Sequence, residues 1–143
     1  MAALEFAAFL ELSLRLLARQ APACYARLAG AGAGDAVRFA VEGQPVRLRF
    51  VDGRHRIECG EAAAVEVRSD RATIGAFADG ELSLLEAVLA ERFSIRGAAD
   101  AVARFDAALL AFVDGALRSP SFPALFEAFR RESPAQAAAR FSL

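Results

Sequence analysis

The sequence predicts an α+β protein with one five-stranded, mainly antiparallel sheet and helices packed on one face of it. Two observations carry this prediction. Between residues 37 and 68, apolar residues recur at every second position, which is typical of strands with one buried face. Before and after this region they recur every three or four positions, as in amphipathic helices. The predicted order of elements is α-ββββ-α-α-β-α-α.

Length and composition predict one soluble domain over residues 1–143, with an N-terminal helix in 1–30, a core in 35–117 and a Phe-rich helix and tail in 120–143. A chain of this size buries about 68–70% of its unfolded surface, so a substantial core can form. Hydrophobic residues make up 56% of the chain and the net charge is −1, which excludes disorder and gives no reason to expect a nucleic-acid partner. We expect a cytoplasmic protein.

The first predicted helix covers residues 4–19. Glu11, Arg15 and Arg19 form a polar stripe at spacings of four, and the rest of the helix surface is apolar. These charges argue against a signal peptide or a membrane span. The glycine-rich stretch from Gly30 to Asp35 is predicted to be a loop.

Four strands are predicted next, and each alternates apolar with charged residues. Asp52-Gly53 is a strong hairpin signal, because both central positions of a type I′ turn need positive φ. We expect the strands to form a meander with one apolar and one charged face. They cover residues 37–41, 46–50, 55–59 and 65–68.

The helical period returns at Asp70, which can cap a short helix containing Ile74 and Phe77. Ser83 and Glu86 have the spacing of a capping box for the next helix. A fifth strand follows at 93–96.

The last two predicted helices complete the order. One begins at Asp100 and extends to Ala116, and the other covers 122–131. Five strands form a layer about 24 Å wide, on which only two or three helices fit side by side. The surplus apolar helix surface must therefore form a second layer, meet a partner or surround an apolar ligand. Eight of the twelve phenylalanines lie from Phe77 onward, and such rings suit the wall of a pocket, although ordinary core packing remains the alternative for each.

The stretch "LSLLEAVLAERFSIRGAADAVARFDAALL" (residues 82–110), together with this order of elements, resembles the sterol carrier protein 2 family of lipid-binding domains. In that family a helix is followed by a basic residue, a short strand, a glycine and a second helix. Arg92, Gly97 and Asp100 occupy the corresponding positions here. The "FVDGRHRIECG" hairpin (residues 50–60) also fits, and the resemblance covers about residues 35–117. The chain departs from the pattern at Glu91, where the family favours glycine, and in the two alanines between Gly97 and Asp100.

The resemblance implies a hydrophobic tunnel between sheet and helices, which binds a sterol, a fatty acid, an acyl chain or a prenyl lipid without chemical change. Phe122 to Phe129 is the candidate lid. The candidate ligand-binding residues are Phe50, Ile57, Phe77, Leu85, Leu89, Phe105, Leu109, Phe112, Phe122 and Phe126.

No catalytic, metal or cofactor site is expected. His55 is the only histidine, so any triad or metal site would have to use it, and a structural role is the favoured interpretation. Cys24 and Cys59 have no metal-binding spacing, and we expect buried free thiols.

Six arginines share the polar face of the predicted sheet. A solvated, salt-bridged surface is the favoured interpretation. The alternative is an anion-binding surface for nucleic acid, lipid headgroups or an acidic partner, and of these transient docking on an anionic membrane suits a lipid carrier better than nucleic acid does. They are Arg38, Arg47, Arg49, Arg54, Arg56 and Arg68.

A second function stays open alongside lipid binding or transfer. The apolar helical face could bind a partner helix or form a homodimer, as in an accessory or scaffold module of the kind that bacterial relatives supply in quinone biosynthesis. An enzyme is the least favoured alternative, with His55 as its most plausible centre.

Overall fold

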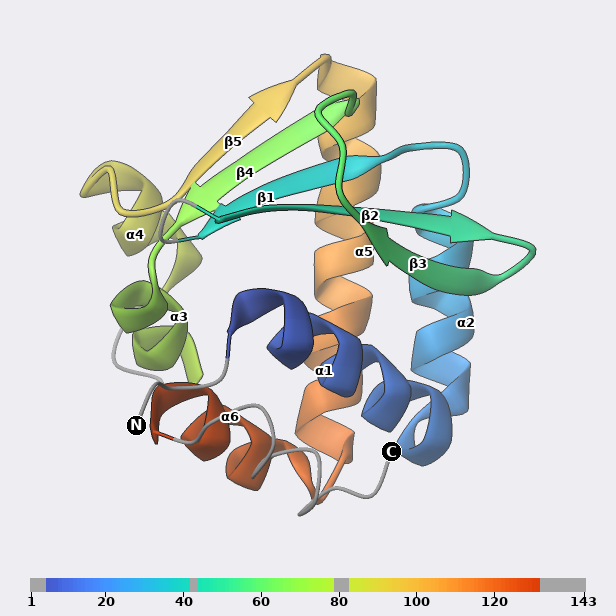
Figure 1. The fold of residues 1–143 in the computed structure, drawn as a ribbon, viewed down its shortest axis with the longest axis vertical. Coiled ribbons are helices and arrows are strands. Elements are labelled where there is room, and N and C mark those ends of the chain that lie inside the picture. The colour runs from blue at the N-terminus through green and yellow to red at the C-terminus, as the bar shows by residue number, and fades with distance from the viewer. Residues whose placement is uncertain (1–4, 42–43, 79–82, 132–143) are drawn as a thin grey trace. The chain divides into compact units, whose positions relative to one another are not determined.

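The computed structural model describes residues 5–41, 44–78 and 83–131, and the chain forms two compact units (Figure 1). One unit consists of Gly32–Asp106 and contains the sheet. The other combines the N-terminal residues up to Ala31 with the chain from Ala107 onward and contains helices. The boundary falls inside the long helix α5 (Ala99–Arg118).

Five strands form one sheet in the spatial order β3-β2-β1-β4-β5. The antiparallel pairs are β1 with β2, β2 with β3, and β4 with β5, whereas β1 and β4 run parallel. The strands are β1 (Val37–Val41), β2 (Gln44–Val51), β3 (Arg54–Glu58), β4 (Val65–Ser69) and β5 (Ser94–Gly97). The predicted α+β class and mainly antiparallel sheet are therefore confirmed.

The simple meander is wrong at one position, because β4 pairs with β1 and not with β3. Two parallel neighbours need a crossover connection, and here the β2–β3 hairpin supplies it. Alternation along a strand defines its faces but not its neighbour, so the sequence pattern could not reveal this pairing. The hairpin turn itself is confirmed, since Asp52 and Gly53 have φ of 54° and 76°.

Strand register separates the two faces of the sheet. The inner face carries Val37, Phe39, Val41, Val46, Leu48, Phe50, His55, Ile57, Val65, Val67 and Ile95. The outer face carries Arg38, Arg47, Arg49, Arg54, Arg56, Glu58, Glu66, Arg68, Ser94 and Arg96, together with the small or apolar residues Ala40, Pro45 and Val51. The Phe105 ring of α5 lies 6.3 Å from the Phe39 ring, so α5 begins against the inner face.

Two short helices precede β5 in the sheet unit, α3 (Arg71–Ala78) and α4 (Leu84–Leu89). Asp70 accepts a hydrogen bond from the Thr73 amide at 2.7 Å, which satisfies one of the free N–H groups at the start of α3. Ser83 and Glu86 form both bonds of the predicted capping box.

The helical unit contains α1 (Phe6–Gln20), α2 (Pro22–Ala31), the second half of α5 and α6 (Phe122–Arg131). Helix α2 is absent from the predicted order, because small residues fill it and no clear apolar stripe marks it. Its one signal is Pro22 at the first helical position, where a missing N–H costs nothing. Helix α2 also includes Gly30 and Ala31, which were predicted to be loop.

Candidate functional site

The inner face of the sheet is apolar but not uniformly packed. Val65 and Val67, on β4 next to the central strand β1, are 1% and 2% exposed. Four large apolar side chains retain partial exposure, although they point to the same side: Phe39, Phe50, Ile57 and Ile95. Such half-buried apolar surface on one face is what a hydrophobic ligand would cover.

The half-buried residues lie in two neighbouring groups. Phe39 has Val67 as its register partner on β4, and Val67 in turn faces Ile95 on β5. On the other side, Leu48 faces Ile57, and Phe50 faces His55. Apolar side chains therefore continue across all five strands.

The predicted ligand-binding residues divide between the two units. Phe50, Ile57, Leu89 and Phe105 belong to the sheet unit, and of these Phe50 and Ile57 lie on the inner face. Leu109, Phe112, Phe122 and Phe126 belong to the helical unit. Phe77 and Leu85 lie in α3 and α4, but their side chains lie outside the part that the structure describes. Leu89 is 75% exposed, so its side chain is not enclosed.

The predicted lid helix, α6, packs on α1 within the helical unit. The Phe129 ring stacks on the Phe9 ring with centroids 4.3 Å apart, and Phe126 lies 5.4 Å from Phe9. Phe122 meets Phe112 of α5 edge-on at 5.7 Å. Phe129 and Leu125 are fully buried, so α6 is part of a core in this structure. The rest of the predicted tail, residues 132–143, lies outside the described residues.

Ion pairs organise part of the outer face. Glu58 accepts hydrogen bonds from Arg47 at 2.8 Å and from Arg49 at 2.6 Å, and these two guanidinium groups hold the pKa of Glu58 below its usual value. Arg68, with a smaller contribution from Arg38, lowers the pKa of Glu66 in the same way. The salt-bridged interpretation is therefore confirmed for these four arginines.

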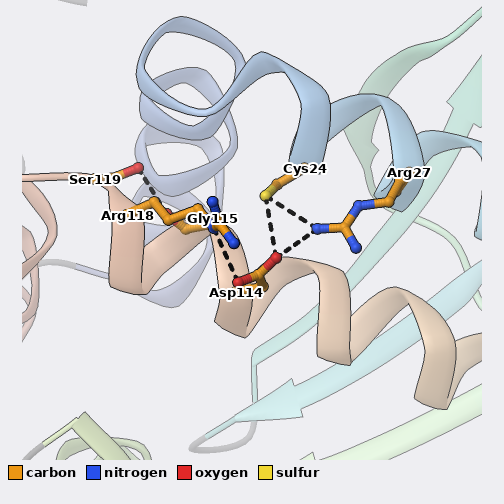
Figure 2. Close-up of polar contacts among 6 residues, drawn as sticks. All are labelled: Cys24, Arg27, Asp114, Gly115, Arg118 and Ser119. Carbon is orange, nitrogen blue, oxygen red and sulfur yellow. Dashed lines mark hydrogen bonds and ion pairs between the residues drawn. The ribbon is translucent and has the colours of Figure 1, made fainter.

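A polar cluster joins α2 to α5 in the helical unit (Figure 2). The Cys24 thiol donates to Asp114 Oδ2 at 3.6 Å, and the Arg27 guanidinium donates to both the Cys24 sulfur and Asp114. Arg118 also donates to Asp114, at 3.0 Å. Arg27 and then Arg118 lower the pKa of Asp114. Cys24 is 4% exposed, and this cluster links α2 to α5 by hydrogen bonds.

The described side chains form no group of three or more histidine, cysteine or acidic residues that could hold a metal ion. His55 is half-buried in β3 opposite Phe50. Cys59 is exposed, contrary to the prediction that both cysteines are buried, because it follows the last residue of the edge strand β3. No described helix is long and apolar enough to span a membrane.

Two aromatic residues were not among the predicted ligand-binding residues, although the structure packs both against other aromatic rings. Phe39 is half-buried on the inner face beside Phe105. It lies two positions from Val37 and from Val41, and this period-two spacing was the signal that could have identified it. The sequence does not single out Phe9, because its helix is apolar on most sides. Only its ring contacts with α6 distinguish it from the other apolar residues of α1.

No protein-family model matches the sequence, and no curated protein matches it either. Solved structures do resemble it. A crystal structure of sterol carrier protein 2 is 21% identical, with a TM-score of 0.53, over 78% of this chain and 96% of that chain. A structure described as "UbiJ-SCP2 Ubiquinone synthesis protein" is 18% identical, with a TM-score of 0.52, over 73% of this chain and 88% of that chain. The predicted resemblance to the sterol carrier protein 2 fold is confirmed.

Proposed function

We propose that this chain is a non-catalytic lipid-binding protein that holds the hydrocarbon part of its ligand against the inner face of the sheet. The observation that carries the proposal is the half-buried apolar surface of Phe39, Phe50, Ile57 and Ile95 on that face. The sterol carrier protein 2 fold supports it as the framework. The ligand class is a sterol, a fatty acid or acyl chain, or a prenyl lipid.

The binding energy in this proposal comes from burial of apolar surface. Each methylene transferred from water contributes about 0.8 kcal/mol, so about ten buried methylenes correspond to a micromolar Kd without any polar contact. We place the ligand beside Phe50, Ile57 and Phe105, which all belong to the sheet unit. Further contacts are proposed from the sequence alone at Phe77, Leu85 and Leu89 of the sheet unit and at Leu109, Phe112, Phe122 and Phe126 of the helical unit. To act as a lid, α6 would have to leave α1.

Organic extraction and native mass spectrometry of the purified protein test this proposal. We expect a co-purifying lipid, and displacement of a fluorescent fatty acid by added lipid. Absence of both would overturn lipid binding.

The two cysteines are free, which fits the proposed cytoplasmic location, where thiols stay reduced.

An accessory role in quinone biosynthesis is the second candidate, and the similarity to the UbiJ-SCP2 structure favours it. An exposed apolar stripe on α5 supplies a surface for a partner or a homodimer: Leu110, Val113 and Leu117 are 63%, 46% and 84% exposed. Light scattering after size exclusion tests the homodimer. If the chain forms a homodimer, the double variant Leu110→Glu, Leu117→Glu should be a monomer. A monomeric wild-type protein would exclude the homodimer.

A further inference from the structure

The outer face of the sheet has a positive net charge, although the net charge of the whole chain is close to zero. It carries seven arginines and two glutamates, a net charge of +5, among its described residues. The other ten arginines and sixteen acidic residues of the sequence sum to −6. The chain as a whole is nearly neutral, so this surface is a local feature and not a consequence of general basicity.

The arginines are arranged at a cost to stability. Arg38 lies directly opposite Arg47 on the neighbouring strand, and Arg49 lies directly opposite Arg56. Like charges in such cross-strand pairs are destabilising. The two glutamates relieve only part of this repulsion, since each is shared between two arginines.

Three arginines remain available for an external anion. Arg54, Arg56 and Arg96 are exposed, and within the described residues none of them forms an ion pair. They lie on β3 and β5, the two edge strands, so that they flank the paired arginines from both sides. No aromatic side chain shares this face among the described strand residues.

We infer that the outer face of the sheet is a docking surface for bilayers of anionic phospholipid. Its arginines are spread over all five strands, and so they match a broad negative surface better than one small anion, which would need them to converge. A broad sheet face does not enter a nucleic-acid groove, and without aromatic rings it offers no platform for stacked bases. The inference builds on the proposed function, because a lipid carrier has to meet the bilayer that holds its ligand.

Vesicle co-sedimentation tests this surface. The full chain is mixed with phosphatidylcholine vesicles with and without phosphatidylserine. We expect binding only to the anionic vesicles, and loss of that binding between about 0.1 M and about 1 M NaCl, where the Debye length falls from about 10 Å to about 3 Å. The triple variant Arg54→Gln, Arg56→Gln, Arg96→Gln should bind about 100-fold more weakly, since each arginine near an anionic membrane contributes about fivefold.

The matched control is Arg15→Gln, Arg19→Gln, Arg118→Gln, which removes the same charge from α1 and α5. It should bind within about threefold of wild type, because its arginines lie outside the proposed surface and contribute only through long-range charge. Equal binding by wild type and the face variant, equal loss in both variants, or no binding of wild type to anionic vesicles would overturn the inference. Preferential binding of an RNA or DNA oligonucleotide that the face variant loses would reassign the surface to nucleic acid.

Circular dichroism and thermal unfolding of each variant check that the fold is intact. Fatty-acid displacement separates this inference from the proposed function. The face variant should displace the probe like wild type, because its substitutions are on the opposite face from the apolar residues. Vesicle binding without any fatty-acid binding by wild type would remove the proposed function and leave the docking surface.

Discussion

The Phe9 ring of α1 stacks on the Phe129 ring of α6, with centroids 4.3 Å apart and an interplanar angle of 28°. Both side chains are buried, and Phe129 is 0% exposed. This contact joins residues 120 positions apart in the sequence, so it ties the C-terminal helix to the first one. A lid formed by α6 would have to break it.

Replacing Phe129 by alanine should lower the free energy of unfolding by about 3–5 kcal/mol, because it removes a fully buried ring and leaves a cavity. Urea unfolding followed by circular dichroism measures this change. Val88→Ala is the control, since Val88 is 44% exposed, lies outside the apolar stripe of α5, and its loss should change stability by less than about 0.5 kcal/mol. A loss below about 1 kcal/mol for Phe129→Ala would indicate that α6 does not form part of the core.

Glu91→Gly should stabilise the protein by about 1 kcal/mol, because Glu91 has φ of 60°, a left-handed conformation that is costly for any residue with a Cβ. The residue ends α4 in a Schellman motif: the Glu91 amide donates to Val88 O, and the Arg92 amide donates to Ala87 O. Glu91→Ala is the control, since it removes the carboxylate but keeps the Cβ. Equal midpoints of thermal unfolding for the two variants would contradict this explanation.

Gly97→Ala should destabilise the protein by about 1–3 kcal/mol, because the new Cβ would lie 2.5 Å from the Ala64 carbonyl oxygen and backbone would have to move. Gly97 faces Val65 where β5 pairs with β4. Gly30→Ala is a matched control, since nothing lies within 4 Å of a Cβ there. If Gly97→Ala unfolds at the same urea concentration as wild type and Gly30→Ala, the close approach of Gly97 to the Ala64 carbonyl is contradicted.

Acid should weaken the link between α2 and α5. The hydrogen bond from Arg27, and then that from Arg118, lowers the pKa of Asp114, so this carboxylate stabilises the folded state above its unfolded pKa of about 3.9. That stabilisation is lost as the pH falls through the unfolded value toward the lower, folded one. Arg27→Gln should reduce the dependence of stability on pH between about 5 and about 2, measured by urea unfolding at each pH. An unchanged pH profile would show that the pair contributes nothing.

Phe39→Ala should weaken fatty-acid binding by about 10-fold to 100-fold, because a buried phenylalanine contributes about 1.5–3 kcal/mol of apolar contact. Displacement of a fluorescent fatty acid measures the change. Val88→Ala in α4 is the control, since Val88 is partly exposed and lies outside the inner face of the sheet. Retention of wild-type affinity by Phe39→Ala would exclude the inner face beside Phe39 as the binding site.

The local pattern of the sequence is sufficient for most of the elements. Alternation with period two placed Val37, Phe39 and Val41 on one face, and the Asp52-Gly53 turn and the Ser83–Glu86 capping box formed as expected. These features depend on residues at most a few positions apart, so the chain encodes them locally. The resemblance around Gly97 also indicated the correct fold.

Tertiary contacts decided the rest. The parallel pairing of β1 with β4 joins strands separated by a whole hairpin, and periodicity within a strand carries no information about such a partner. The burial of Phe129 against Phe9, and the partial exposure of Phe39 and Phe50, depend on which distant side chains fill the space around them. The sequence by itself determined every element except α2, and the apolar faces of the strands, because those follow from local periodicity and backbone geometry. Only the tertiary structure decided which apolar surface is core and which is left half-covered, because burial is a property of contacts between distant parts of the chain.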